Sequence, residues 1–257
     1  MSVLHQADMT ICDAHLHLTR EDLSRLTDWR AAGAVGLASA TAHYTEWPEA
    51  IALADEQLPN VRFALGIHPW HLEEVPESVL EELDMLLANC PALAIGEIGL
   101  DFADGRNDRE RQLHWFEAQL VLAEKYRRPA VLHLRRAWDC APTILAKYPE
   151  VTTVLHSFNG SREVAQQLLS TLSNCYFSFG FALGNPSATR QAGAAQVIPA
   201  NRLLVDSDYP FQRLPGAEES SPIDLNAIIK RLGELRQESP ALLATQIMEN
   251  WQRVFIP

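Results

Sequence analysis

Five histidines lie at or just beyond the ends of short apolar runs along the chain. A single histidine at such a place is usually a hydrogen-bonded core or rim residue, but five at the same end of successive runs are hard to obtain by chance. Neutral imidazoles are ligands that zinc and manganese accept readily. The pattern therefore predicts a site for divalent metal. The five are His15, His17, His68, His133 and His156.

The first two of these histidines are two residues apart. On an extended backbone His15 and His17 point to one face while Ala14 and Leu16 point to the other. An H-x-H pattern alone is a weak signal. An inward-facing Asp13 before it and a carboxylate on a later strand would complete a metal site.

Carboxylates appear where such a site needs them. Glu97 follows an apolar run and lies between two glycines, Gly96 directly before it and Gly99 two residues after it. A buried acid without a partner is costly, and a metal ion is the simplest partner. Asp206 and Asp208 likewise follow an apolar run. Either could instead cap a turn before the next proline, an interpretation that suits Asp206 better than Asp208.

The elements that would position these residues alternate between strand-like and helix-like patterns. Short apolar runs alternate with amphipathic stretches, which is typical of a parallel sheet with crossover helices. The strand candidates are 11–14, 34–39, 61–67, 92–95, 130–132, 152–155, 176–179 and 203–205, and the clearest helix candidates are 81–88, 109–125, 162–172 and 225–235. Eight such repeats predict an α/β fold, a (β/α)8 TIM barrel that forms a single domain over residues 1–257. Residues 209–221, after the last strand, are expected to form a loop that shapes the substrate site.

Composition limits the classes of protein that are possible. The chain of 257 residues has 33 acidic and 21 basic side chains, a net charge of −12, and is 47% hydrophobic, so it is neither disordered nor fibrous. This charge argues against a protein that coats DNA through many phosphate contacts. No signal peptide and no run of 18 apolar residues is visible, and no membrane association is expected. The four cysteines are far apart, and we expect reduced thiols in a cytoplasmic protein.

The sequence resembles the TatD family of metal-dependent nucleases, within the amidohydrolase superfamily of barrels. The resemblance covers nearly the whole chain, and its most specific segment is Ala94–Asp101, which matches the family's A-I-G-E-I-G-L-D. The other matches are D-x-H-x-H at 13–17, G-x-H-P at 66–69, Q-L-x-L-A at 119–123, H-x-R at 133–135, H-S-F-x-G at 156–160, D-x-P at 208–210 and a closing N-x-x-x-x-F at 250–255.

The resemblance implies a centre of two divalent ions, which could be zinc, manganese or magnesium. It assigns His15, His17, Glu97 and Asp208 to one ion, and Glu97, His133 and His156 to the second, so that Glu97 bridges. Asp208 and Glu97 would be catalytic, with Asp208 orienting a water molecule and accepting its proton. His68 and Arg135 would face the substrate phosphate, although Arg135 could equally form a surface ion pair. Asp101 matches the family motif but could also cap the fourth helix.

The chain also departs from the family pattern, mostly after the last strand. Asp206 replaces the usual Glu, Arg136 stands where an acid usually follows the H-x-R arginine, and Tyr209 replaces a small residue. The family's R-G-x-x-N-E-P-like segment is not recognisable in residues 212–222. The ligand set is therefore complete, while the substrate side differs.

The function expected from these features is metal-dependent hydrolysis of phosphodiester bonds by a TatD-like deoxyribonuclease, acting as an exonuclease on DNA ends. One alternative is a hydrolase for a small amide, lactone or phosphoester, since barrels of this type change substrate by loop variation. Another is a non-catalytic barrel subunit of a larger assembly, against which the complete ligand set argues. Protein partners are not indicated by the sequence.

Overall fold

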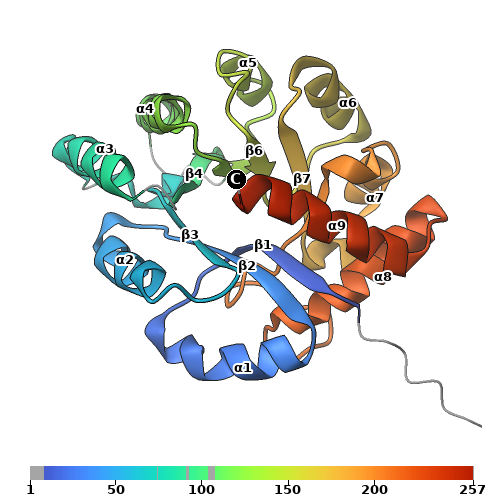
Figure 1. Cartoon of the computed structure of the whole chain (residues 1–257). Coiled ribbons are helices and arrows are strands. Elements are labelled where there is room, and N and C mark those ends of the chain that lie inside the picture. Colours follow the sequence, from blue (N-terminus) through green and yellow to red (C-terminus); the bar gives the residue numbers. More distant parts are fainter. Residues whose placement is uncertain (1–8, 74, 91–92, 104–107, 257) are drawn as a thin grey trace, which may run out of the picture.

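The apolar runs form eight parallel strands, which pair in chain order and close into a barrel through β1 and β8. This computed structural model describes residues 9–73, 75–90, 93–103 and 108–256, and Figure 1 shows the barrel with its surrounding helices. The expected (β/α)8 fold is confirmed. The strands are β1 (Ile11–Leu16), β2 (Ala34–Ala40), β3 (Val61–Leu65), β4 (Ala94–Asp101), β5 (Ala130–Arg135), β6 (Thr153–Leu155), β7 (Cys175–Phe179) and β8 (Leu203–Val205).

The helices lie outside the strands and bury their apolar faces against them. The four predicted amphipathic stretches are all helical, and α4 begins at Arg109 because Asp108 caps it by accepting a hydrogen bond from the Glu110 backbone N–H. The helices are α1 (Leu23–Ala31), α2 (Trp47–Asp55), α3 (Ser78–Asn89), α4 (Arg109–Tyr126), α5 (Ala141–Leu145), α6 (Arg162–Thr171), α7 (Thr189–Ala195), α8 (Leu225–Arg236) and α9 (Pro240–Phe255).

Strands β1, β4 and β5 run further than the apolar patterns predicted. They end at Leu16, Asp101 and Arg135, so that several polar residues expected beyond the strands lie within them. The pairing of β4 with β5 explains the extension, since the ladder continues from Ile98 through Asp101 opposite Arg135. Position 92, where the fourth strand was expected to begin, lies outside the described residues.

The interior of the barrel is apolar beneath the polar end. Val131 and Val154 each precede a histidine by two residues, so that side chains on the same face of β5 and β6 change from valine to histidine along the barrel axis. Trp251 of α9 belongs to the same apolar cluster as these valines and donates a hydrogen bond from Nε1 to the Asp13 carbonyl at 2.9 Å. Helix α9 lies across this end of the barrel (Figure 1). The opposite, carboxyl end holds the histidines.

Two further sequence expectations concern cysteines and membranes. The four cysteines are free thiols, two of them buried. Within the described ranges, none of the helices has the length and apolarity needed to cross a membrane.

Candidate metal centre

His15 and His17, at the end of β1, face two carboxylates from other strands. The Nε2 atoms of both histidines lie 3.4 Å from Asp208 Oδ1, and they lie 3.4 and 3.6 Å from Glu97 Oε2. Asp208 comes three residues after β8, which is the neighbour of β1 in the closed barrel. Barrel closure thus brings together residues that are almost two hundred positions apart.

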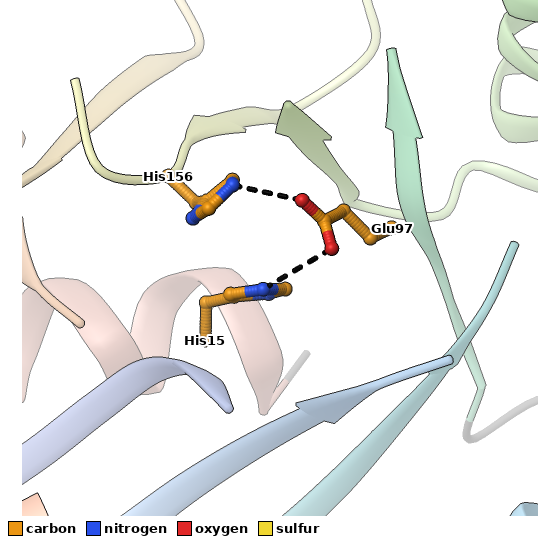
Figure 2. Close-up of side chains that lie close together, drawn as sticks. All are labelled: His15, Glu97 and His156. Atoms are coloured by element: carbon orange, nitrogen blue, oxygen red, sulfur yellow. Dashed lines mark ion pairs between the residues drawn. The ribbon is translucent and has the colours of Figure 1, made fainter. Parts of the chain in front are cut away.

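The other oxygen of Glu97 faces a second pair of histidines. Glu97 Oε1 lies 2.9 Å from His133 Nδ1 and 2.8 Å from His156 Nε2. The two nitrogens are 3.1 Å from each other. Figure 2 shows Glu97 between His15 and His156, with one carboxylate oxygen directed to each. Glu97 therefore connects the two groups of histidines.

The imidazole nitrogens and carboxylate oxygens of this site fit divalent cations. The supporting observation is that His15 is buried without a hydrogen-bond partner. His15 is fully buried, and neither of its ring nitrogens has a hydrogen-bond partner, although Nε2 faces both carboxylates. A buried polar atom without a partner costs free energy, and a cation among these atoms would remove that cost. In the part of the chain that the structure describes, side-chain ligand atoms within 4.8 Å of one another form three groups: His15, Glu97 and His156; His15, His17 and Asp208; and His68, Glu97 and His133.

The pKa shifts of the buried groups indicate a site that favours positive charge. Burial disfavours ionisation of Glu97 and Asp208, but the surrounding imidazoles outweigh it and hold the pKa of both carboxyl groups well below the usual range. Burial lowers the pKa of His15, yet Glu97 and Asp208 raise it overall to about 9. The pKa of His156 is raised well above its ordinary value against the same cost of burial. Two buried carboxylates thus create a negative potential that a divalent cation would share with the imidazoles.

His68 belongs to the same cluster but offers a proton rather than a lone pair. Its Nδ1 accepts a hydrogen bond from the Trp70 backbone N–H at 3.1 Å, which leaves the ring proton on Nε2. That Nε2 lies 3.5 Å from Glu97 Oε1. Burial lowers the pKa of His68 to about 3, so the ring is neutral. In this tautomer His68 is a hydrogen-bond donor facing the site.

Asp101, the last residue of β4, lies behind His133. Its Oδ2 accepts hydrogen bonds from Trp70 Nε1 at 2.7 Å and from His133 Nε2 at 3.4 Å, and its Oδ1 accepts one from the Ala103 backbone N–H. The alternative that Asp101 caps the fourth helix is wrong, because Asp108 does so. Asp101 instead fixes the ring of His133 so that Nδ1 faces Glu97.

Arg135 forms an ion pair, one of the two roles that the sequence left open. Its Nη1 lies 3.6 Å from Asp101 Oδ2, an ion pair with a fully buried carboxylate. The side chain of Arg135 remains 44% exposed. The register of β4 and β5, which pairs Asp101 with Arg135, explains this contact. The guanidinium is thus held at the rim next to the second group of histidines.

Asp206 does not cap a turn, contrary to the sequence expectation. Its carboxylate accepts hydrogen bonds from the backbone N–H and the hydroxyl of Ser157, and its Oδ1 lies 3.7 Å from His156 Nδ1. The turn before the proline is closed by the hydroxyl of Ser207, which accepts from the Tyr209 backbone N–H. Asp206 therefore supports the loop that carries His156.

Asp13 faces inward as expected but lies outside the three groups of possible ligands among the described residues. Its carboxylate accepts hydrogen bonds from the backbone N–H and the hydroxyl of Ser207, at 3.1 and 2.5 Å, and from the His15 backbone N–H. Asp13 thus ties the end of β1 to the segment after β8.

The sequence did not single out Gln212, Trp70 or Ser157 as contributors. Gln212 Nε2 donates to Asp208 Oδ2 at 2.8 Å and to Ser157 Oγ at 3.2 Å, so it holds Asp208 from the loop side. Nothing in the types or spacing of these residues marks them. Asp101 had a signal, because alternation along a strand places Glu97 and Asp101 on one face.

Comparison with known proteins shows the family to which the chain belongs. The sequence model of the family described as TatD related DNase matches residues 12–256. The chain belongs to the TatD family. An uncharacterized metal-dependent hydrolase of Escherichia coli K12, YjjV, is 31% identical over 210 residues, covering 80% of each chain. A TatD protein of Pantoea ananatis, named a 3'-5' ssDNA/RNA exonuclease, is 29% identical over 241 residues, covering 88% of this chain and 90% of that protein.

Solved structures of the TatD family have the same fold. The crystal structure of YjjV from Escherichia coli aligns with a TM-score of 0.88 at 28% identity, covering 96% of this chain and 98% of that one. A TatD family hydrolase from Entamoeba histolytica aligns with a TM-score of 0.80 at 19% identity, covering 97% of this chain and 99% of that one. The chain is therefore a metal-dependent hydrolase of the TatD family by descent, with candidate ligand groups at the expected end of its barrel.

Proposed function

We propose that the chain is a phosphodiester hydrolase that uses two divalent ions, a TatD-like deoxyribonuclease acting at strand ends. The observation that carries the proposal is that the two oxygens of Glu97 face different pairs of histidines, Oε2 toward His15 and His17 and Oε1 toward His133 and His156. Such paired sites suit phosphodiester cleavage, which needs positive charge at both the attacking and the leaving oxygen. The proposed ligands are His15, His17, Glu97 and Asp208 for one ion, and Glu97, His133 and His156 for the other.

The bound ions would supply Lewis acidity and lower the pKa of a water molecule toward neutrality. Asp208 is ionised at neutral pH, because the pKa of its carboxyl group is held low by His15 and His17 against the cost of burial. We assign Asp208 to orient the attacking water and accept its proton. Gln212 holds the Oδ2 atom of Asp208, which leaves Oδ1 toward the histidines. His68 would donate from Nε2 to a phosphoryl oxygen, and Arg135 would neutralise phosphate at the rim.

The net charge of −12 is compatible with a nucleic acid substrate. Two divalent ions against the carboxylates of Glu97 and Asp208 leave a site near +2, which attracts phosphate although the surrounding surface repels it. The relatives named as exonucleases for single-stranded DNA and RNA support a polynucleotide substrate. We propose that the protein acts in the cytoplasm and that residues 1–257 form a single domain.

A small amide, lactone or phosphoester remains the second candidate substrate because of the loop between β8 and α8. That loop replaces the family's usual basic segment and carries Glu218 and Glu219 beside Arg213 in a cleft of about 530 Å³. Acidic side chains next to the site would repel a long phosphate backbone more than a small neutral substrate.

One assay panel separates these candidates. Single-stranded DNA, duplex DNA, RNA, a simple phosphodiester and a neutral amide or lactone would be offered to the protein with zinc, manganese or magnesium. We expect cleavage of single-stranded DNA and of the phosphodiester. Hydrolysis of the amide or lactone alone, with no phosphodiester cleaved under any metal, would overturn the proposal.

A further inference from the structure

Exposed aromatic side chains are confined to the mouth of the metal centre. The sequence contains 20 Phe, Tyr and Trp residues. Among those the structure describes, Phe211 and Trp70 alone are exposed, at 72% and 41%. Large apolar rings left in water at one place on a surface mark a binding site more often than chance. Both rings therefore need an explanation that the metal ligands do not supply.

Each ring lies against a different group of the metal centre. The ring of Phe211 meets the ring of His17 edge-on, with centroids 5.0 Å apart. The ring of Trp70 lies 5.0 Å from that of His68 and 6.0 Å from that of His133. Because His17 and His133 contact opposite oxygens of Glu97, the two aromatic rings lie on the two sides of Glu97. A phosphate held by metal ions beside Glu97 would have one ring on each side.

Hydrogen bonds fix the backbone turn that carries Phe211 and the indole ring of Trp70. The backbone N–H groups of Phe211 and Gln212 donate to the Asp208 carbonyl at 2.7 and 3.1 Å, which closes a tight turn. The indole N–H of Trp70 donates to the buried Asp101 at 2.7 Å. Ring faces fixed before a ligand arrives cost little conformational entropy on binding.

From this arrangement we propose that Phe211 and Trp70 form a stacking subsite for the two unpaired nucleobases that flank the scissile phosphate of a single-stranded polynucleotide. The inference depends on the proposed phosphodiester hydrolysis and adds how the substrate is recognised. Aromatic side chains stack on any base, so the subsite tolerates sequence. Bases within a duplex are covered on both faces by their neighbours and cannot occupy it.

Stacking also explains how an acidic protein gains affinity for a polyanion. Most single-strand binding proteins combine a positively charged groove with aromatic rings. With a net charge of −12, this chain attracts a polyanion less at long range than a basic protein does, so the base faces would supply a larger share of the affinity. Attraction of the phosphates then comes from the metal ions, with Arg135 at the rim.

The test pairs ring variants with abasic substrates. kcat/KM would be measured, with metal supplied, on single-stranded oligonucleotides that lack the base on one or the other side of the cleaved bond. Loss of one base should lower the value for the wild type by about 5- to 150-fold. Phe211→Ala should abolish this penalty at one position and Trp70→Ala at the other. Phe211→Trp should keep it, whereas Phe211→Leu, which retains apolar area without a π face, should not.

Two controls isolate stacking. Trp70→Phe keeps a ring but removes the N–H that Asp101 accepts, so it separates stacking from support of the metal centre. Leu242→Ala removes an equally exposed apolar side chain, 72% accessible, on α9 at the other end of the barrel, and should leave every penalty unchanged. A 2-aminopurine base beside an uncleavable phosphorothioate link should lose fluorescence on binding to the wild type but not to the matching ring variant.

The outcomes distinguish failure of this inference from failure of the proposed function. An abasic penalty that is equal in the wild type and in both ring variants, while the wild type cleaves the natural oligonucleotide, would overturn the stacking subsite alone. If the ring variants lose cleavage of a p-nitrophenyl ester but still cleave oligonucleotides normally, the rings would belong to a site for a small aromatic substrate. That result would also overturn the stacking subsite. No cleavage of either the oligonucleotide or bis(p-nitrophenyl) phosphate by the wild type would refute the proposed function itself.

Discussion

Glu97 is the residue on which both halves of the candidate metal centre depend. Its two oxygens face different histidine pairs, and the side chain is almost completely buried. Loss of its charge would leave imidazoles facing one another in both groups.

Glu97→Gln is therefore expected to reduce metal occupancy at both positions, because the amide is neutral and only one of its two heavy atoms can accept. Metal content after equilibration with zinc or manganese, measured by elemental analysis, checks this. Glu124→Gln, an exposed change on α4, is the control and should bind metal normally. Loss of one ion with the other unaffected would show that Glu97 does not bridge.

Asp208→Asn should lower kcat by about 10² to 10⁴, since the amide oxygen can still face a metal but the side chain no longer accepts the proton of the attacking water. The expected loss of bound metal is smaller. Steady-state kinetics with metal content measured in parallel separates the two effects. Asp84→Asn, which removes an exposed partner of Lys125, should leave kcat unchanged. Full turnover in Asp208→Asn would move the base role to another group, with Asp206 examined first.

Asp101→Asn tests whether the hydrogen bond from His133 to Asp101 orients the His133 ring for metal binding. The amide can still accept from Trp70 but holds the His133 ring less strongly, and loss of such an outer partner typically weakens metal affinity by about 10- to 100-fold. Competition with a chelator measures the affinity. Asp139→Asn breaks an exposed ion pair with Arg109 and serves as the matched control. Equal affinities in the two variants would limit Asp101 to its contacts with Trp70 and Arg135.

At the scale of elements, strand β4 shows why the sequence predicts the fold better than the details of the site. Apolar periodicity places all eight strands, because burial against helices demands it. The extension of β4 to Asp101 is invisible to that pattern, since its last residues include Glu97 and two glycines, at 96 and 99, with positive φ. The burial of Glu97 is stabilised by partners on β1, on β5 and just after β6, which only the closed barrel brings near.

The residues that position the proposed ligands by hydrogen bonds were the least predictable from the sequence. His15, His17, His133 and His156 follow from residue type and position at strand ends. The hydrogen bonds of Asp206 to Ser157, and of Gln212 to Asp208, depend on loop conformations for which spacing carries no signal. The turn-capping interpretation of Asp206 was wrong for that reason.

The backbone of β4 at Gly99 gives a prediction at this scale. Gly99 has a φ of +151°, and a Cβ built there would overlap the carbonyl oxygen of His133 on β5. Gly99→Ala should therefore destabilise the barrel by more than the roughly 1–3 kcal/mol of ordinary overpacking. Gly193→Ala, within α7 and with no atom within 4 Å of the new Cβ, should be neutral or stabilise by up to about 1 kcal/mol. Denaturant unfolding compares them, and equal midpoints would contradict the close approach of β4 to β5.

At the scale of the whole molecule, the proposed ligands come from every part of the chain. They belong to β1, β4, β5 and to the segments after β6 and β8, from position 15 to position 208. No short stretch of the unfolded chain can present more than the His15 and His17 pair together. Metal binding is therefore coupled to closure of the barrel rather than to any one element.

Divalent metal should for this reason raise the melting temperature of the whole barrel. A ligand that binds the folded state alone stabilises it by about 2.7 kcal/mol when present at 100 times its dissociation constant, and in a chain of this size each 1 kcal/mol corresponds to roughly 2–4 °C. Calorimetry with and without zinc or manganese should thus show a rise of about 5–11 °C. In Glu97→Gln the rise should largely disappear, while in Glu124→Gln it should persist. An equal rise in all three proteins would place the stabilising ion elsewhere on the molecule, and the metal centre at the carboxyl end of the barrel would then lose its strongest physical support.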